Sequence, residues 1–482
     1  MQGKTLRPET EVPPLNVEVD VAVIGAGTAG LAAYRAAKAA GARAVIIEGG
    51  PYGTTCARVG CMPSKLLIAA AEAAHAIDRA RGFGVHVDGP VRVDGREVMA
   101  RVKRERDRFV GFVLEGVDSI PEADRIRGYA RFVDRNTLEV ENGPRIRARS
   151  IVIATGSRPT FPPILRDLGD RLVVNDDIFD WETLPKSVAV FGPGVIGLEL
   201  GQALARLGVR VVVLGRGGRV GPITDPVVRE AAIKAFRADF MLDPDAHVTR
   251  VKRIGDEVEI EYRGIDGEAR RERFEYVVAA TGRVPNVDRL DLENAGLERD
   301  SHGVPRFDSR TLQAGASPVF IAGDVNNELA LLHEAADEGR IAGDNAARFP
   351  DVKPGLRRAP LGIVFTDPQI AIVGGGYAHP HAESISVGEV SFEDQGRSRV
   401  MLRNHGHLRV YADPVSGRFL GAEMVGPDAE HIGHLLAWAL QANLTVAQML
   451  EMPFYHPVVE EGLRTALRDL DARIKEHQPL AA

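Results

Sequence analysis

The feature that most constrains the fold is a glycine-centred pattern that occurs twice in the chain. The first copy is DVAVIGAGTAGLAAYRAAKAAGARAVIIEGG (residues 20–50) and the second is SVAVFGPGVIGLELGQALARLGVRVVVLGR (residues 187–216). Each is an apolar run, a glycine cluster, a helical Ala/Leu pattern and a second apolar run. This order is typical of a strand, a helix and a second parallel strand. The sequence therefore predicts two β-α-β units.

The glycines of both units follow the spacing GxGxxG at the start of the predicted helix. This spacing permits a tight turn and lets a pyrophosphate approach the backbone at the helix N-terminus. Glu48 ends the second strand of the first unit, where a carboxylate can accept a hydrogen bond from a ribose hydroxyl. We therefore predict two dinucleotide sites, with Gly25, Gly27, Gly30, Gly192, Gly194 and Gly197 at their phosphates.

A second repeat follows each unit, an apolar strand that ends in Ala-Thr-Gly, at residues 150–159 and 276–285. Near the C-terminus, RVYADPVSGRFLGAEMVG alternates apolar and polar residues around Asp-Pro, which predicts an antiparallel hairpin. The fold class predicted is α/β, with two Rossmann-like dinucleotide-binding domains and a C-terminal α+β domain. The predicted domains are residues 1–158 with 284–350, an insert at 159–283, and residues 351–482.

Composition excludes several other classes of protein. The chain is 44% hydrophobic and 26% charged, with a net charge of -7, so it is globular and we expect no nucleic-acid partner. No apolar run reaches the roughly 18 residues of a membrane span, so no membrane partner is expected either. The first 20 residues have mixed charge and no apolar core, unlike a signal or transit peptide, and about 15 of them are expected to be unstructured. With two cysteines in all, the chain is expected in the cytoplasm.

Both cysteines, Cys56 and Cys61, lie in GTTCARVGCMPSK (residues 53–65). Residues five apart on a regular helix have Cα atoms on the order of 8–9 Å apart, too far for a disulfide. A Cys56–Cys61 bridge therefore needs an irregular turn, which Gly60 allows. We expect Pro63 to begin the next helix, so that Cys61 lies just before a helix N-terminus that favours a thiolate.

A ring this small gains little loop-closure entropy, so the bridge should be readily reduced and redox-active. The alternative is a metal site, but two thiolates are only half of a zinc shell and no Cys/His cluster completes it, so no metal is predicted. Two nucleotide sites with a dithiol indicate a flavin, a nicotinamide and a disulfide that pass electrons in series.

The sequence resembles the flavin-dependent pyridine nucleotide-disulfide oxidoreductases over nearly its whole length from about residue 18. Besides the glycine clusters and the two Ala-Thr-Gly strands, the likeness rests on FIAGDV (320–325), LLHEAADEG (331–339), FTDPQIAIVG (365–374) and PFYHPVVEEGLRTAL (453–467). The resemblance implies an enzyme with FAD and NAD(P) as cofactors.

The resemblance also implies roles for individual residues. Cys56 is the interchange thiol that meets the substrate, and Cys61 is the thiol against the flavin. Lys65 approaches the flavin and pairs with Glu199, and Asp324 binds the FAD ribityl chain. Further cofactor contacts are expected at Thr155, Gly156, Gly282 and Arg216.

His456 and Glu461 form the other expected catalytic pair. Because proline can begin a helix, Pro457 places His456 just outside a helix and Glu461 in its second turn. A carboxylate near an imidazole orients the ring and raises its basicity. By the resemblance this pair reaches the disulfide site of a second subunit, which implies a homodimer with a shared active site.

Some positions depart from the pattern of the family. Thr54 replaces a glycine, Arg58 an asparagine, Gln369 a glutamate, and Gly215, followed by Arg216, stands where NAD-specific members carry an acid. The CMPSK motif and the lack of further thiols favour a substrate like that of the dihydrolipoamide dehydrogenase subgroup. A reductase for glutathione or another small disulfide, a soluble transhydrogenase, and a subunit bound to the lipoyl domain of a 2-oxo acid dehydrogenase complex are the alternatives.

Overall fold

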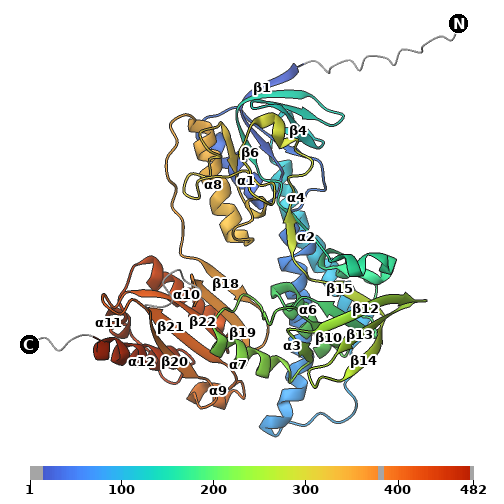
Figure 1. The fold of residues 1–482 in the computed structure, drawn as a ribbon, viewed down its shortest axis with the longest axis vertical. Coiled ribbons are helices and arrows are strands. Elements are labelled where there is room, and N and C mark those ends of the chain that lie inside the picture. The colour runs from blue at the N-terminus through green and yellow to red at the C-terminus, as the bar shows by residue number, and fades with distance from the viewer. Residues whose placement is uncertain (1–14, 378–384, 478–482) are drawn as a thin grey trace, which may run out of the picture. The chain divides into compact units, whose positions relative to one another are not determined.

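The computed structural model describes residues 15–377 and 385–477 (Figure 1). Most of the predicted unstructured lead therefore lies outside the described residues. Contacts divide the chain into two units. The first unit holds the chain up to Ala57 together with Phe109–Arg158 and Arg283–Arg357, and the second holds Arg58–Arg108, Pro159–Gly282 and the chain from Arg358 onward. The three-domain division stays a prediction.

The first unit is built on a parallel sheet whose strand order is β3-β2-β1-β6-β17. Residues Val21–Ile24 of its central strand are buried, as expected where helices or further strands cover both faces of a parallel sheet. A short antiparallel extension, β4-β5, continues from β6. The strands are β1 (Leu15–Ile24), β2 (Ala44–Glu48), β3 (Arg125–Arg127), β4 (Ala130–Asp134), β5 (Thr137–Val140), β6 (Arg145–Ile153) and β17 (Val319–Ile321), and β7 (Ser157–Pro159) pairs with β16 (Arg283–Pro285).

Helices α1 (Thr28–Ala39) and α8 (Leu332–Arg348) lie side by side against this sheet (Figure 1). Their backbones approach closely, because a Cβ atom at Gly339 would lie 2.1 Å from the Ala29 carbonyl oxygen. One at Gly343 would lie 2.1 Å from the Ala33 carbonyl oxygen. The glycines of α8 therefore hold this helix against the one that opens at the first glycine cluster.

The second unit contains a parallel sheet of the same kind, in the order β11-β10-β9-β15-β8. Both predicted β-α-β units are thus confirmed, as β1-α1-β2 and β9-α6-β10. A three-stranded antiparallel sheet, β12-β13-β14, follows β11 in the chain. The elements are α5 (Asn175–Ile178), β8 (Leu172–Val174), β9 (Ser187–Phe191), α6 (Val195–Arg206), β10 (Arg210–Leu214), α7 (Pro226–Phe236), β11 (Met241–Asp243), β12 (His247–Ile254), β13 (Glu257–Arg263), β14 (Ala269–Phe274) and β15 (Tyr276–Ala279).

The C-terminal part of the second unit is an antiparallel sheet in the order β18-β19-β22-β21-β20, packed against helices. The predicted hairpin is confirmed as β21 and β22, which pair antiparallel. The elements are β18 (Leu361–Val364), β19 (Gln369–Gly374), β20 (Ser386–Ser391), α9 (Gly396–Val400), β21 (His407–Ala412), β22 (Phe419–Gly426), α10 (Ala429–Gln441), α11 (Val446–Leu450) and α12 (Glu461–His477).

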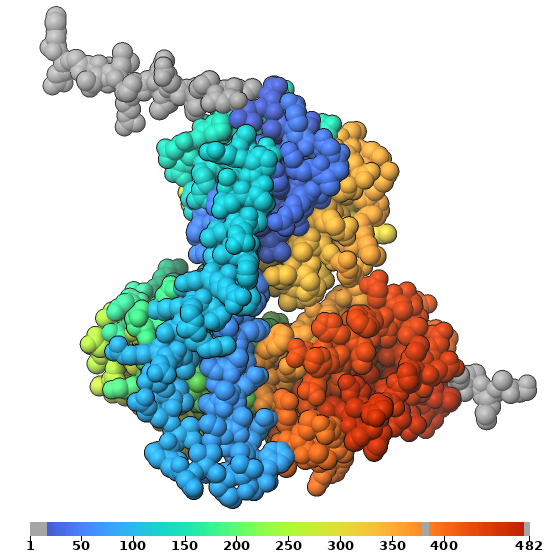
Figure 2. Space-filling model, turned by 180° about the vertical axis from the view of Figure 1, so that it is seen from behind, coloured from blue at the N-terminus to red at the C-terminus, as the bar shows by residue number. Residues whose placement is uncertain are grey.

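Three helices follow the first β-α-β unit, and the first two carry the thiols. They are α2 (Thr55–Val59), α3 (Cys61–Ala80) and α4 (Gly95–Asp118). The charged helix α4 buries Met99 and Val102. Residues 81–92, between α3 and α4, are all exposed and belong to the light-blue surface of the second unit in Figure 2.

Candidate active site

The first glycine cluster forms a tight turn with one open position. Gly25 has φ +104°, and a Cβ atom there would lie 2.3 Å from the Ala154 carbonyl oxygen. A Cβ atom at Gly30 would lie 1.8 Å from the Gly25 carbonyl oxygen, whereas one at Gly27 would meet nothing within 4 Å. Gly27 is the N-cap of α1, so its open face lies at the positive end of the helix. This arrangement fits a pyrophosphate.

Glu48 ends β2 beside this turn. Its Oε2 accepts a hydrogen bond from the Ala26 N–H at 2.7 Å, and its Oε1 accepts one from the Gly50 N–H at 2.7 Å. The carboxylate is therefore fixed at the C-terminal edge of the parallel strands, next to the open glycine. This is where an acid can also accept from a ribose hydroxyl.

The second glycine cluster reproduces the first closely. Gly192 has φ +104°, and a Cβ atom there would lie 2.3 Å from the Ala280 carbonyl oxygen. One at Gly197 would lie 1.9 Å from the Gly192 carbonyl oxygen, and one at Gly194 would meet nothing within 4 Å. A second dinucleotide therefore fits at the N-terminus of α6.

Gly215, where an acid is usual, lies in a crowded place. A Cβ atom there would lie 2.5 Å from the Pro244 carbonyl oxygen and 2.7 Å from Cγ of Pro193. The backbone after β10 thus has no room for a side chain at this position. The next residue, Arg216, is exposed, and its contact with the nucleotide remains a prediction.

Each of the two Ala-Thr-Gly turns forms hydrogen bonds with a neighbouring segment of the chain. Thr155 Oγ1 donates to the Asn286 carbonyl oxygen at 2.8 Å, and the Asn286 N–H donates to the Gly156 carbonyl oxygen at 3.0 Å. In the second turn, the Gly282 carbonyl oxygen accepts from the Thr160 N–H at 3.0 Å. These bonds hold the turns at the ends of β6 and β15, and a cofactor contact there remains a prediction.

Asp324 follows β17 and is held within the first unit. Ser157 Oγ donates to its Oδ2 at 3.1 Å. On either side of Asp324, the Gly323 N–H and the Asn326 side-chain amide donate to Oε2 of Glu338, at 2.8 and 2.7 Å. Burial raises the pKa of Glu338, although the Gly323 N–H and Arg357 act in the opposite direction.

Glu338 was missed as a site residue from the sequence. It lies in the LLHEAADEG motif and is fully buried, and the Arg357 guanidinium lies 2.9 Å from its Oε1. The available signal was a glutamate directly before Gly339, on the helix face that touches α1. The residue holds the Gly323 backbone and the Asn326 side chain, one on each side of Asp324.

The two cysteines flank a break between α2 and α3. Gly60 has φ -126° and ψ -114°, outside the helical region, so the predicted irregular turn is confirmed. The prediction that Pro63 begins the helix is wrong, because α3 already begins at Cys61. The thiol is thus even closer to the helix N-terminus than expected. Cys56 is half-buried and Cys61 exposed, so exposure alone does not assign their roles.

The departure at Thr54 lies in a backbone conformation that glycine adopts easily. Thr54 has φ +57°, a conformation that side chains rarely adopt, and β-branched side chains least of all. Its Oγ1 accepts a hydrogen bond from the Ala57 N–H at 3.3 Å, at the start of α2. This bond offsets part of the strain in the turn that leads to Cys56.

Lys65, one turn after Cys61, forms the expected pair with Glu199 of α6. The ammonium donates to Glu199 Oε2 at 2.7 Å and lies 4.6 Å from the centre of the Phe365 ring. Glu199 is 4% exposed and its Oε1 accepts from the Phe365 N–H at 2.8 Å, whereas Lys65 is 32% exposed. The carboxylate is therefore fixed on both oxygens and holds the cation at a partly open position.

His456 and Glu461 also form the expected pair. His456 Nδ1 lies 2.9 Å from Glu461 Oε2, and Arg464 donates to Glu461 Oε1 at 2.8 Å. Burial acts to raise the pKa of Glu461, but His456 and Arg464 stabilise the carboxylate and the net shift is downward. Because Nδ1 is engaged, Nε2 of this 80%-exposed histidine is available to exchange a proton.

The predicted helix start beside this pair is wrong. Glu461 is the first residue of α12 and does not lie in its second turn, because Pro457 starts no helix and a turn fills residues 456–460. The carboxylate therefore lies at the N-terminus of α12, where the helix dipole stabilises negative charge.

Among residues 15–377 and 385–477, no cluster of three or more His, Cys, Asp or Glu side chains could hold a metal ion. Within the same ranges, no helix has the length and apolarity needed to cross a membrane.

Comparison with known proteins identifies the family. The sequence profile described as "Pyridine nucleotide-disulphide oxidoreductase" matches residues 19–339. The profile described as "Pyridine nucleotide-disulphide oxidoreductase, dimerisation domain" matches residues 361–467, which supports a homodimer.

Relatives cover nearly the whole chain. A dihydrolipoyl dehydrogenase of Haloferax volcanii is 34% identical over 93% of this chain and 95% of its own length. A mercuric reductase of Acidithiobacillus ferrooxidans is 30% identical over 95% of this chain and 84% of its own.

Solved structures share the fold. LpdA of Mycobacterium tuberculosis superposes with a TM-score of 0.79 at 24% identity, covering 94% of this chain and 99% of that one. The Cu(II) complex of the HOCl-induced flavoprotein disulfide reductase RclA of Escherichia coli gives a TM-score of 0.78 at 23% identity, covering 96% and 100%. The chain therefore belongs to the pyridine nucleotide-disulphide oxidoreductase family, as a class I oxidoreductase that uses FAD and NAD(P).

Proposed function

We propose that the enzyme is a dihydrolipoyl dehydrogenase, which oxidises a small dithiol through a Cys56–Cys61 disulfide and reduces NAD(P)⁺. One observation carries this proposal: two thiols flank the break before α3, and the Lys65–Glu199 ion pair, whose carboxylate is buried, follows one helical turn later. The relative at 34% identity, a dihydrolipoyl dehydrogenase, supports the choice of substrate.

FAD would be held by residues of the first unit. Gly27 would face its pyrophosphate, Glu48 its ribose and Asp324 its ribityl chain. The chemistry that bound FAD supplies is two-electron exchange between a dithiol and a nicotinamide. The cation of Lys65 would favour negative charge on the reduced cofactor.

The dithiol step uses the protein's own groups. A substrate thiolate attacks Sγ of Cys56, which forms a mixed disulfide and releases Cys61 as a thiolate. The second substrate thiol loses its proton to His456 of the partner subunit and attacks the substrate sulfur of the mixed disulfide, which releases Cys56. The substrate leaves as a disulfide, and the enzyme disulfide has gained two electrons as the dithiol pair.

Cys61 is suited to the leaving role by its position. As the first residue of a 20-residue helix it lies at the positive end of the helix dipole, which stabilises a thiolate. His456 is suited to the proton role because Glu461 orients its ring through Nδ1.

Exposed aromatic side chains in the C-terminal region support an active site shared between two copies. Trp438 of α10 is 69% exposed and Tyr455, next to His456, is 79% exposed. Aromatic side chains at such exposure favour burial against another protein surface. Because these side chains lie in the region matched by the dimerisation profile, we place a second copy against them.

The proposal is tested by steady-state assays with dihydrolipoamide and NAD⁺ or NADP⁺, and with glutathione disulfide and NADH or NADPH. We expect kcat/KM for dihydrolipoamide to exceed that for glutathione disulfide by about 100-fold or more.

A reductase for a small anionic disulfide is the second candidate, because Arg58 adds a cation to α2 between the two thiols. The reverse preference would establish it. A lipoyl domain as physiological partner and a cytoplasmic location remain predictions.

A further inference from the structure

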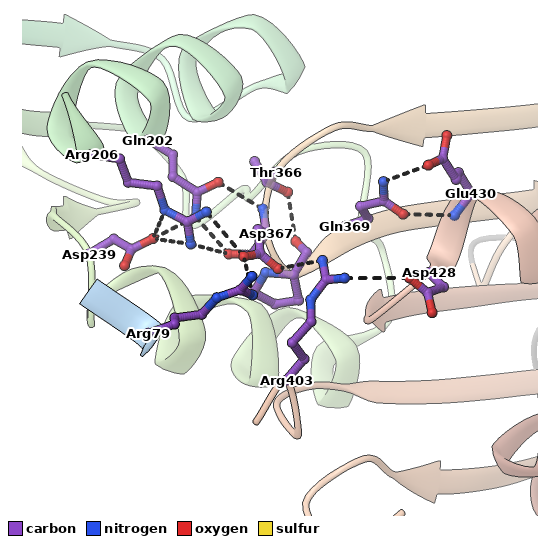
Figure 3. Close-up of polar contacts among 11 residues, drawn as sticks. Arg79, Gln202, Arg206, Asp239, Thr366, Asp367, Gln369, Arg403, Asp428 and Glu430 are labelled. Carbon is purple, nitrogen blue, oxygen red and sulfur yellow. Dashed lines mark hydrogen bonds and ion pairs between the residues drawn. The ribbon is translucent and has the colours of Figure 1, made fainter. Parts of the chain in front are cut away.

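A partly buried polar cluster in the second unit joins three separate stretches of the chain (Figure 3). We call it the Asp367 junction. It comprises Asp367 with Arg79, Gln202, Arg206, Asp239 and Arg403.

Asp367 is the centre of this junction. Its Oδ2 accepts from Arg206 of α6 at 3.1 Å and lies 3.8 Å from the Arg79 guanidinium of α3. Its Oδ1 accepts from Arg403 at 3.1 Å. Figure 3 shows the three guanidinium groups converging on this one carboxylate. The helix that carries the thiols, the nucleotide block and the C-terminal sheet region therefore meet here.

The charges at the centre are buried but balanced. Arg206 is 7% exposed and Asp367 16%. Burial acts to raise the pKa of Asp367, but Arg206 and Arg403 overcome this and lower it, so the carboxylate stays ionised. Asp239 accepts hydrogen bonds from Gln202 at 2.8 Å and from Arg206 at 2.9 Å, so it supplies a second negative charge beside the arginines.

The Asp367 junction also includes hydrogen bonds to the backbone of Asp367. The Gln202 side-chain amide accepts from the Asp367 N–H at 2.8 Å and donates to the Asp367 carbonyl oxygen at 2.7 Å. Two residues earlier, the Phe365 N–H donates to Glu199, and its ring lies under the Lys65 ammonium. Glu199, Gln202 and Arg206 lie on successive turns of one face of α6, so the segment 365–367 is fixed along that face.

We propose that Asp367 is a positioning residue for the Lys65–Glu199 pair. Its ion pairs lock the segment 365–367 onto α6, which keeps the Phe365 N–H on Glu199 and the Phe365 ring on Lys65. The charge next to the redox thiols is thereby set from a junction two helical turns away. The consequence for FAD rests on the function proposed above.

The competing role is that Asp367 only holds parts of the second unit together. Asp225 offers a matched control, because it is fully buried and also links the nucleotide block to the C-terminal sheet. It accepts from Arg409 at 2.9 Å and from Tyr411 at 3.0 Å, and it caps α7. Its contacts lie on α7 and β21, away from the segment 365–367.

The experiment compares holoenzyme carrying Asp367→Asn, Arg403→Gln or Asp225→Asn with the wild type. The amine of Lys65 is labelled with a limiting acylating reagent, and peptide mass spectrometry gives the rate relative to exposed Lys252 in the same chain. The midpoint potential of bound FAD is measured on the same samples. Arg403→Gln removes one partner of Asp367 at a 29%-exposed side chain, so this variant keeps the test open if Asp367→Asn does not fold.

We expect Asp367→Asn to raise the relative labelling rate of Lys65 about fivefold or more, and Arg403→Gln to raise it by a smaller factor. Asp225→Asn should leave the ratio unchanged even where it lowers stability. An unchanged ratio in both junction variants, or an equal rise in Asp225→Asn, would overturn the proposal. A raised ratio with an unmoved FAD potential would uphold the positioning role and count instead against the proposed contact of Lys65 with FAD.

Discussion

Alanine at the two glycines of the second cluster should separate nucleotide binding from folding. Gly194 has φ -76° and ψ -175°, which alanine adopts readily, and its Cβ atom would meet nothing within 4 Å. Gly197 lies in the same turn, but its Cβ atom would lie 1.9 Å from the Gly192 carbonyl oxygen. The two substitutions add the same methyl group, in one case to open space and in the other against a backbone carbonyl group.

The magnitudes follow from these distances. Ordinary contact begins at 3.4 Å, so Gly197→Ala requires the turn and the helix to separate by about 1.5 Å. Overpacking against backbone of this kind costs about 3 kcal/mol. Gly194→Ala should change stability by less than about 0.5 kcal/mol. Its methyl group would occupy the place where a pyrophosphate meets the helix N-terminus, and losing a charge-assisted hydrogen bond there should weaken nucleotide binding about tenfold or more.

The assay measures the thermal unfolding midpoint and the Kd for NADH and NADPH in both variants. Gly194→Ala should keep the midpoint and lose affinity, whereas Gly197→Ala should lower the midpoint by about 5 °C or more. Gly27→Ala, the matching change in the first cluster, should release FAD without loss of apoprotein stability. If Gly194→Ala binds both nucleotides as tightly as the wild type, the assignment of the open glycine to the pyrophosphate is refuted.

Three further predictions concern single side chains. Glu338→Gln should weaken FAD retention about tenfold, because the charge that fixes both sides of Asp324 is lost; dialysis and FAD fluorescence measure it, and unchanged retention would contradict the role. His456→Ala should slow dithiol turnover by about 10²-fold but leave FAD reduction by the nicotinamide intact. Verified heterodimers with Cys56→Ser should recover activity through one intact site, and no recovery would argue against sharing across subunits. The wild type should use NADPH at least as well as NADH, with Arg216→Ala raising KM for NADPH far more; a preference for NADH above about tenfold would rule this out.

The glycine spacing and the apolar periodicity predicted both β-α-β units. A glycine at position 30 is required by a contact inside the turn itself, with the Gly25 carbonyl oxygen, so the local sequence indicates the strand, turn and helix. Helix starts were less predictable. Proline favours the first turn of a helix but does not define its first residue, and the break at Gly60 rather than Pro63 sets the start of α3.

No short sequence pattern predicted the Asp367 junction. Its side chains come from positions between Arg79 and Arg403 and meet only after three separate stretches have folded. Gln369, noted as a departure from the family pattern, is explained in the same way. Its amide donates to Glu430 Oε1 at 3.2 Å and accepts from the Glu430 N–H at 3.1 Å (Figure 3), so a glutamate there would face another carboxylate.

The central claim is that Cys56 and Cys61 form the disulfide that a dithiol reduces. The direct measurement mixes oxidised holoenzyme with dihydrolipoamide without nicotinamide, under anaerobic conditions, and quenches with an alkylating reagent at successive times. We expect both cysteines to resist alkylation before mixing and to become alkylated in step with substrate oxidation. If the substrate is oxidised while both thiols stay unmodified, or if both are alkylated before the substrate is added, Cys56 and Cys61 do not form this disulfide.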